Sequence, residues 1–155
     1  MTMNWNAVVS EEDTVFVLGD FVMRPTVEKL RVASRLNGKK ILIPGNHDNC
    51  WRGHEAHELW RQRYLDAGFT AIVDKVDMYF DDFDLKLSLS HFPFDDDKPG
   101  WERFDNWRSV DDGQWLLHGH IHSRRRVSGR QIHVGCDAWN WAPVSLDRIL
   151  ELIVE

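Results

Sequence analysis

The most informative segment of this chain reads Gly45-Asn46-His47-Asp48. It follows an apolar run that is typical of a buried β-strand. Two other segments repeat this design, in which a turn glycine stands beside nitrogen or oxygen donors after an apolar run; they read Gly19-Asp20 and Gly119-His120-Ile121-His122. Ligands of open α/β sheets bind at the carboxyl ends of the strands, so we expect these side chains to gather at one sheet edge.

The surrounding patterns predict an α/β protein. Short β-branched or alternating runs predict strands at residues 14–18, 39–44, 71–79, 83–90, 114–118 and 131–136. Apolar stripes predict helices at residues 25–36 and 54–66, and a last helix capped by Ser145. The acidic turn Asp81-Asp82 favours an antiparallel hairpin. This order favours a layered sandwich, with mixed sheets inside and helices outside.

Length and composition limit the class of protein. The 155 residues suit a single domain that spans residues 1–155, with no apolar run long enough to cross a membrane. The two cysteines predict free thiols in a reducing cytoplasm. The net charge of −6 argues against general nucleic-acid binding. It still allows a small phosphorylated or nucleotide substrate, because bound metals would invert the local charge. An oligomer is compatible with this composition.

The donor residues suit a pair of divalent cations. The Asp20 carboxylate has two oxygens and can bridge two ions, Asn46 offers an amide oxygen, and His91 follows the strand 83–90. His120 and His122 are two residues apart and can therefore reach different ions, which two-metal hydrolases hold roughly 3.5–4 Å apart. Mixed nitrogen and oxygen donors suit manganese, iron, zinc or nickel better than calcium.

His47 and Asp48 have a possible role in proton transfer. A histidine near a bound phosphate can protonate the leaving oxygen, and Asp48 can orient that ring and keep it cationic. Each motif alone has an ordinary structural interpretation, as a turn, a loop or strand alternation, and the shared order and strand-end placement favour the site. Arginines 124–126 can contact a phosphate or form a solvated turn, and aspartates 95–97 are expected in an exposed acidic loop. We expect loops 51–57 and 94–113 to border the substrate pocket.

Together these motifs resemble the calcineurin-like metallophosphoesterase superfamily, in particular its small single-domain bacterial and phage phosphoesterases. The segments that carry the resemblance are residues 15–20, 45–48, 90–93, 118–122, 134–140 and 143–147. The resemblance implies a four-layer αββα sandwich of mixed β-sheets with a di-metal centre at the sheet edge. It also implies hydrolysis of phosphomonoesters or phosphodiesters by a metal-activated hydroxide, with Mn²⁺ the expected ion and iron, zinc or nickel as alternatives.

The resemblance implies a role for each residue. Asp20 would bridge the two metals, and Asn46, His91 and His120 would complete the ligands of one of them. His122 would bind the other metal. The general acid would be His47, with Asp48 as its orienting partner.

One family feature is missing from the sequence. The family begins with a strand that ends in Asp-x-His, whose two side chains bind the same metal as His122, and no Asp-x-His precedes Asp20 here. A chain without this first strand would expose a sheet edge and would bind one metal instead of two. Three explanations stay open: N-terminal truncation, which we favour, a natural short form, or ligands supplied by another chain or segment.

The leading hypothesis is therefore a metal-dependent phosphoesterase. The alternative is a catalytically weak or inactive domain on the same scaffold that binds one metal or a nucleotide. A purely structural interaction module ranks third.

Overall fold

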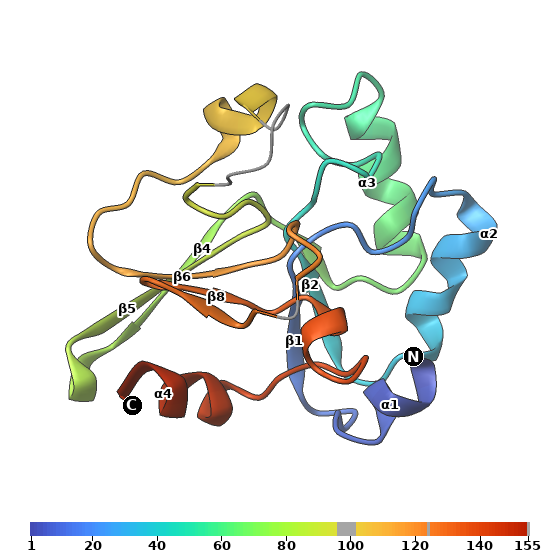
Figure 1. The fold of residues 1–155 in the computed structure, drawn as a ribbon. Helices are drawn as coiled ribbons and strands as arrows, with labels where there is room; N and C mark the ends of the chain where they lie inside the picture. Colours follow the sequence, from blue (N-terminus) through green and yellow to red (C-terminus); the bar gives the residue numbers. More distant parts are fainter. Residues whose placement is uncertain (96–101, 124, 155) are drawn as a thin grey trace.

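The computed structural model describes residues 1–95, 102–123 and 125–154, which form two β-sheets (Figure 1). The first sheet is parallel and contains, in spatial order, β1 (Thr14–Val17), β2 (Lys39–Leu42) and β3 (Ala71–Ile72). The second sheet is mixed, and its spatial order is β4 (Val76–Phe80), β5 (Leu85–Ser90), β6 (Trp115–His118), β8 (Gln131–His133) and β7 (Val127–Ser128).

Helices pack against both sheets. The α-helices are α1 (Thr2–Asn6), α2 (Val27–Leu30), α3 (His57–Asp66) and α4 (Leu146–Val154). Short 3₁₀ helices are η1 (Arg31–Arg35), η2 (Asp81–Phe83), η3 (Glu102–Trp107) and η4 (Cys136–Ala138). Figure 1 shows α2 and α3 on the side of the first sheet that faces away from the second sheet. The sequence-based prediction of an αββα sandwich is confirmed.

Two apolar clusters hold these layers together. Between the sheets, Leu18 and Ile43 pack with Leu87 and Leu117, and Ile149 of α4 joins the same cluster. A second cluster joins the outer helices to the first sheet; it contains Leu30, Ala33, Leu42, Cys50, Tyr64, Ala67, Phe69 and Ile72. Burial of this apolar surface is the main force that presses the layers together. Both faces of the first sheet and the inner face of the second sheet are therefore covered.

The predicted strand at residues 71–79 is two strands in two different sheets. Ile72 pairs in parallel with Leu42 of the first sheet, whereas Val76 pairs antiparallel with Leu89 of the second. The residues between them carry the chain from one sheet to the other. The predicted hairpin does form between β4 and β5, and η2 makes its turn.

The predicted helix at residues 25–36 is shorter and changes type. Thr26 caps α2 by accepting a hydrogen bond from the Lys29 backbone at 3.2 Å, and after Leu30 the chain continues as the 3₁₀ helix η1. Val27 is exposed and lies outside the apolar stripe, which contains Leu30, Ala33 and Leu36. These residues are three apart, and this spacing matches the three residues per turn of a 3₁₀ helix.

The other boundaries differ by a few residues. α3 begins at His57 instead of His54, and residues 94–113, expected as a loop, contain η3. β8 ends at His133, three residues before the expected end of the strand. Ser145 caps α4 as predicted, because its hydroxyl accepts a hydrogen bond from the Arg148 backbone at 3.3 Å. Within the described part of the chain, β1 pairs with β2 alone and forms an edge of the first sheet.

A helix that crosses a membrane has to be both long and apolar. Across residues 1–95, 102–123 and 125–154, no helix combines the length and the apolar composition that crossing a bilayer requires.

Candidate metal centre

Strand ends from both sheets meet closely because glycines stand at the contacts. A methyl group added at Gly19 would overlap the backbone nitrogen of Gly45 and the ring of His91. At Gly119 it would lie 2.7 Å from the Leu18 carbonyl oxygen, inside van der Waals contact. Gly19 also has a φ of +82°, which favours glycine. The turn glycines predicted from the sequence thus allow backbone segments of the two sheets to touch.

Asp48 joins the loops that follow β1 and β2 through hydrogen bonds. One carboxylate oxygen accepts hydrogen bonds from the backbone nitrogens of Asp20 (2.7 Å) and Gly45 (2.9 Å). The other accepts from the backbone nitrogen of Phe21 (3.1 Å) and the hydroxyl of Tyr64 (2.9 Å). The side chain is almost fully buried. Asp48 therefore holds the loops after β1 and β2 in one fixed arrangement.

This arrangement differs from the expected role of Asp48. The four donors on its oxygens come from three backbone groups and Tyr64, and the His47 ring is not one of them. Burial, with a smaller effect of the nearby Asp20 carboxylate, raises the pKa of Asp48 to about 6 against the opposing effect of its hydrogen bonds. Burial also raises the pKa of Tyr64, so its hydroxyl stays protonated and can donate.

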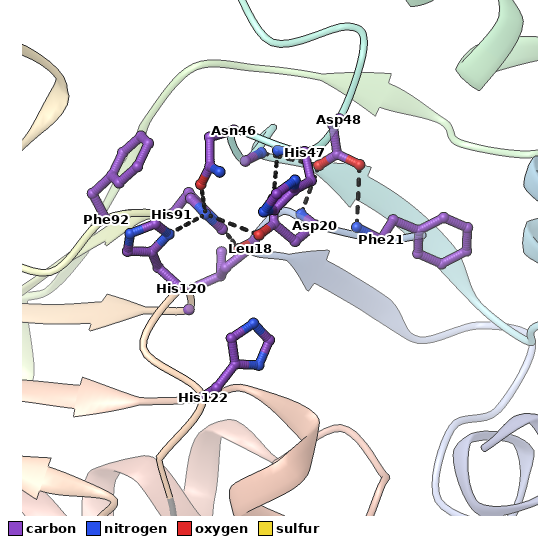
Figure 2. Close-up of polar contacts among 12 residues, drawn as sticks. Leu18, Asp20, Phe21, Asn46, His47, Asp48, His91, Phe92, His120 and His122 are labelled. Carbon is purple, nitrogen blue, oxygen red and sulfur yellow. Dashed lines mark hydrogen bonds and ion pairs between the residues drawn. The ribbon is translucent and has the colours of Figure 1, made fainter. Parts of the chain in front are cut away.

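His91 stands at the centre of a group of donor atoms. Its Nδ1 lies 2.8 Å from the Leu18 carbonyl oxygen. Its Nε2 faces the Asn46 side-chain oxygen at 3.2 Å, His120 Nδ1 at 3.1 Å and an Asp20 oxygen at 3.5 Å (Figure 2). The ligand atoms of Asp20, His91 and His120 all lie within 4.8 Å of one another. Four of the five residues predicted as metal ligands are thus brought together.

The chemistry of this group fits a divalent cation. A carbonyl oxygen can only accept, so His91 Nδ1 carries the ring proton, and in the neutral ring Nε2 presents a lone pair. Burial lowers the pKa of His91, which keeps the ring neutral. The Nε2 lone pair therefore faces the oxygens of Asn46 and Asp20, and an ion that accepts electron pairs from all three would relieve this repulsion. The hydrogen bond to Leu18 fixes the ring tautomer, as such bonds do for metal-binding histidines.

The backbone at these residues is also unusual. Asp20, His120 and His122 have positive φ angles of 53°, 70° and 44°, a region that non-glycine residues seldom adopt. Such conformations cost free energy and are concentrated at functional sites, where the surrounding structure holds them. The strain here falls on three of the five predicted ligands.

His47 lies at the solvent side of the group. Its backbone nitrogen donates a hydrogen bond of 2.9 Å to an Asp20 oxygen, which fixes the loop at that point. Its side chain is exposed, so the ring is open to a molecule that arrives from solvent. Its role as the general acid stays a prediction.

His122 is separated from the other four predicted ligands. Its side chain is 72% exposed, and Figure 2 shows it apart from the hydrogen-bonded network. Its nearest acidic partner is Asp137, with a nitrogen-to-oxygen distance of 3.9 Å, and the other Asp137 oxygen lies 3.9 Å from the buried His133. Asp137 is not among the site residues predicted from the sequence. Its position in Gly135-Cys136-Asp137, just after β8, is the same kind of signal that pointed to Gly19-Asp20.

The other candidate segments have structural partners. Arg126 donates a hydrogen bond of 3.0 Å to the Ala138 carbonyl, and its guanidinium lies 4.1 Å from the centre of the Trp139 ring. Arg125 donates to the Val127 carbonyl at 3.1 Å. Residue 124 and aspartates 96 and 97 lie outside the described residues.

Comparisons with known proteins agree with this geometry. The family model for calcineurin-like phosphoesterases matches residues 2–124. The chain is 37% identical to the Gene 66 protein of Mycobacterium phage L5, over 96% of this chain and 77% of that protein. It is 27% identical to an uncharacterized protein of Methanocaldococcus jannaschii, over 97% of this chain and 71% of that protein.

A solved structure shares the fold. The crystal structure of a protein of unknown function from Aquifex aeolicus superposes with a TM-score of 0.69 at 26% identity, and it covers 97% of this chain and 82% of that one. The family model covers most of the chain, and the two sheets, the helix layers and the strand-end donors agree with it. The chain therefore belongs to the calcineurin-like phosphoesterase family.

Proposed function

We propose that this protein is a metal-dependent phosphoesterase that hydrolyses a small phosphomonoester or phosphodiester. Membership of the family supports phosphoester hydrolysis in general. The observation that carries the proposal for this chain is the convergence of Asp20, His91 and His120, whose ligand atoms lie within 4.8 Å of one another.

The proposed ligands of one cation are Asp20, Asn46, His91 and His120. When bound, such an ion supplies positive charge that holds a phosphate oxygen and lowers the pKa of a water molecule. The protein contributes a neutral His91 ring in a fixed tautomer and loops that Asp48 holds together. Manganese is our first choice of ion, and iron, zinc and nickel suit the same mixed donors.

The proposed general acid is His47. Its exposed ring borders the donor group, and the hydrogen bond from its backbone to Asp20 fixes the loop that carries it. From this position a protonated imidazole would give its proton to the leaving oxygen, a contribution of about 10²–10⁴-fold in rate. Asp48, which we expected to orient this ring, accepts hydrogen bonds from three backbone groups and Tyr64, so its contribution to this proposal is to hold the loops in place.

Hydrolysis assays test the proposal directly. Protein stripped of metal is given Mn²⁺, Fe²⁺, Zn²⁺ or Ni²⁺ in turn and assayed with p-nitrophenyl phosphate and bis-p-nitrophenyl phosphate. We expect turnover with at least one ion and its loss in His91→Ala. The matched control is His57→Ala on α3, outside the donor group, which should keep the wild-type rate. Wild-type protein that turns over neither substrate with any of the four ions would contradict the proposal.

A second candidate is a catalytically weak domain that binds a single metal. The observation that favours it is the exposure and separation of His122, which the two-metal arrangement needs as a ligand. Calorimetric titration with Mn²⁺ separates the two candidates. A stoichiometry of one, together with no turnover, supports the weak domain, whereas two ions and turnover support the enzyme.

A further inference from the structure

A cleft opens directly beside the candidate metal centre. Its volume is about 120 Å³, and its floor contains Pro44, Ser90 and His91. Trp51, from the loop after β2, and Trp107, from the end of η3, form its walls. Because His91 belongs both to the lining of this cleft and to the donor group, the cleft adjoins the metal centre.

The walls of the cleft are aromatic. The rings of Trp51 and Trp107 lie 4.6 Å apart at an angle of 54°. Behind them, Phe92 and Phe104 stack with centres 5.1 Å apart. Trp107 is 40% exposed, so part of its ring reaches solvent. The cleft thus offers aromatic faces to a ligand from solvent.

The backbone holds Trp51 in place. A methyl group added at Gly53 would overlap the six-membered part of the Trp51 ring, so this ring lies directly against the Gly53 backbone. A side chain that is already fixed loses little conformational freedom when it stacks on a ligand. Trp51 is therefore a fixed support for the Trp107 ring, whose centre lies 4.6 Å away.

A charged pair stands on the rim of the same cleft. Arg52 and Asp74 both line it, and their side chains form an ion pair of 2.6 Å while they remain 64% and 46% exposed. Together they present N–H donors and carboxylate acceptors to solvent. A planar group stacked on the exposed part of Trp107 would meet hydrogen-bonding partners along its edge.

We propose that this cleft binds the base of a nucleotide whose phosphate lies at the metal centre. The inference rests on the proposed function and names its substrate class. The aromatic walls match the faces of a nucleobase, and the Arg52–Asp74 pair matches its polar edge. A sugar phosphate without a base lacks the flat π face that stacks on an aromatic side chain.

Binding of a nucleotide tests the inference separately from turnover. Calorimetry on Mn²⁺-loaded protein compares adenosine monophosphate with ribose 5-phosphate, which carries the same phosphate and sugar but no base. We expect the nucleotide to bind about tenfold more tightly or better, the range of base stacking on aromatic side chains. Trp107→Leu should remove most of this preference and leave the affinity for ribose 5-phosphate within about twofold.

Two further variants control this experiment. Phe83→Leu removes another exposed aromatic ring, from the turn between β4 and β5, which Figure 1 shows far from η3, and it should keep the full preference. Trp107→Phe retains an aromatic face and should keep part of it. Because Trp107 is partly exposed, its replacement is compatible with folding, which thermal unfolding verifies.

The outcomes separate the inference from the proposed function. Equal affinities for the two ligands, or equal weakening of both in Trp107→Leu, would overturn the inference even if the p-nitrophenyl esters are hydrolysed. A strong nucleotide preference that depends on Trp107 supports it. Such a preference without any turnover would contradict the phosphoesterase proposal alone.

Discussion

The two histidines expected to bind different metals, His91 and His122, lie in opposite environments. His91 is almost fully buried, its ring tautomer is fixed by the Leu18 carbonyl, and its free nitrogen faces Asn46 and His120. His122 is 72% exposed, and the nearest acidic group described lies 3.9 Å away. One half of the expected centre is held by its surroundings, and the other half is open to solvent.

The difference shows what a preformed metal site requires. Donor atoms are useful only when other contacts hold them in place, since the binding energy is otherwise spent on ordering them. On the His91 side this support comes from the glycine contacts and from the four hydrogen bonds of Asp48. We therefore expect the two sides to respond very differently to substitution.

The largest expected effect is on the free energy of unfolding, and it comes from replacing Asp48, which holds the loops around His91 in place. Asp48→Ala leaves three backbone N–H groups and the Tyr64 hydroxyl without their buried acceptor, and each such loss costs about 1–3 kcal/mol. We expect the free energy of unfolding of the metal-free protein to fall by about 4 kcal/mol, as measured by urea denaturation. The exposed Asp66→Ala should change it by less than about 0.5 kcal/mol. Similar values for both variants would contradict the anchoring role.

The second expected effect is on metal affinity, when a ligand on the buried side of the centre is removed. His91→Ala should weaken Mn²⁺ binding by about a hundredfold or more, because it removes the donor that the other three residues face. Calorimetry on the stripped protein measures this change. A loss below about fivefold would show that the ion binds elsewhere.

The third effect concerns pH. Burial lowers the pKa of His118, at the end of β6, from its ordinary 6.5 to about 4. A histidine with a depressed folded-state pKa contributes stability above pH 6.5 and loses it as the pH falls toward 4. Between pH 7.5 and pH 5 the wild type should lose about 2 kcal/mol more stability than His118→Gln. Unfolding curves at several pH values measure the difference, and parallel profiles would show that the ring is charged in the folded protein.

The smallest expected effect is on metal affinity when His122, on the exposed side of the centre, is replaced. His122→Ala removes a side chain that lies outside the donor group, so the first Mn²⁺ should bind within about threefold of the wild-type affinity. The same calorimetric titration as for His91→Ala measures it. A loss as large as that of His91→Ala would mean that the two histidines share one ion, and the contrast between the two sides would disappear.

Much of the fold was predictable from the sequence because its signals are local. Apolar runs that end in glycine identified β1, β2 and β6, and Ser145 identified the start of α4. The division between β3 and β4 was not predictable, because residues 71–79 have a continuous strand pattern and only pairing with two different sheets separates them.

The candidate site was likewise predictable only where its signals are local in the sequence. Asp20, Asn46, His91 and His120 were identified because each follows a strand, and parallel strand ends meet at one edge. The true partners of Asp48 were not predictable, because Tyr64 lies 16 positions further along the chain, on α3, and gives no signal next to the motif. The separation of His122 depends on a positive φ angle that the letters Gly-His-Ile-His do not reveal.

The close approach of the glycines has a consequence for adapting this protein to new substrates. Gly19, Gly45 and Gly119 leave no space for a side chain, so variation there would disrupt the metal centre before it could change specificity. Trp107 stands on a separate segment that can change without moving those turns. A directed-evolution library should therefore keep the glycine positions constant and diversify the aromatic walls of the cleft.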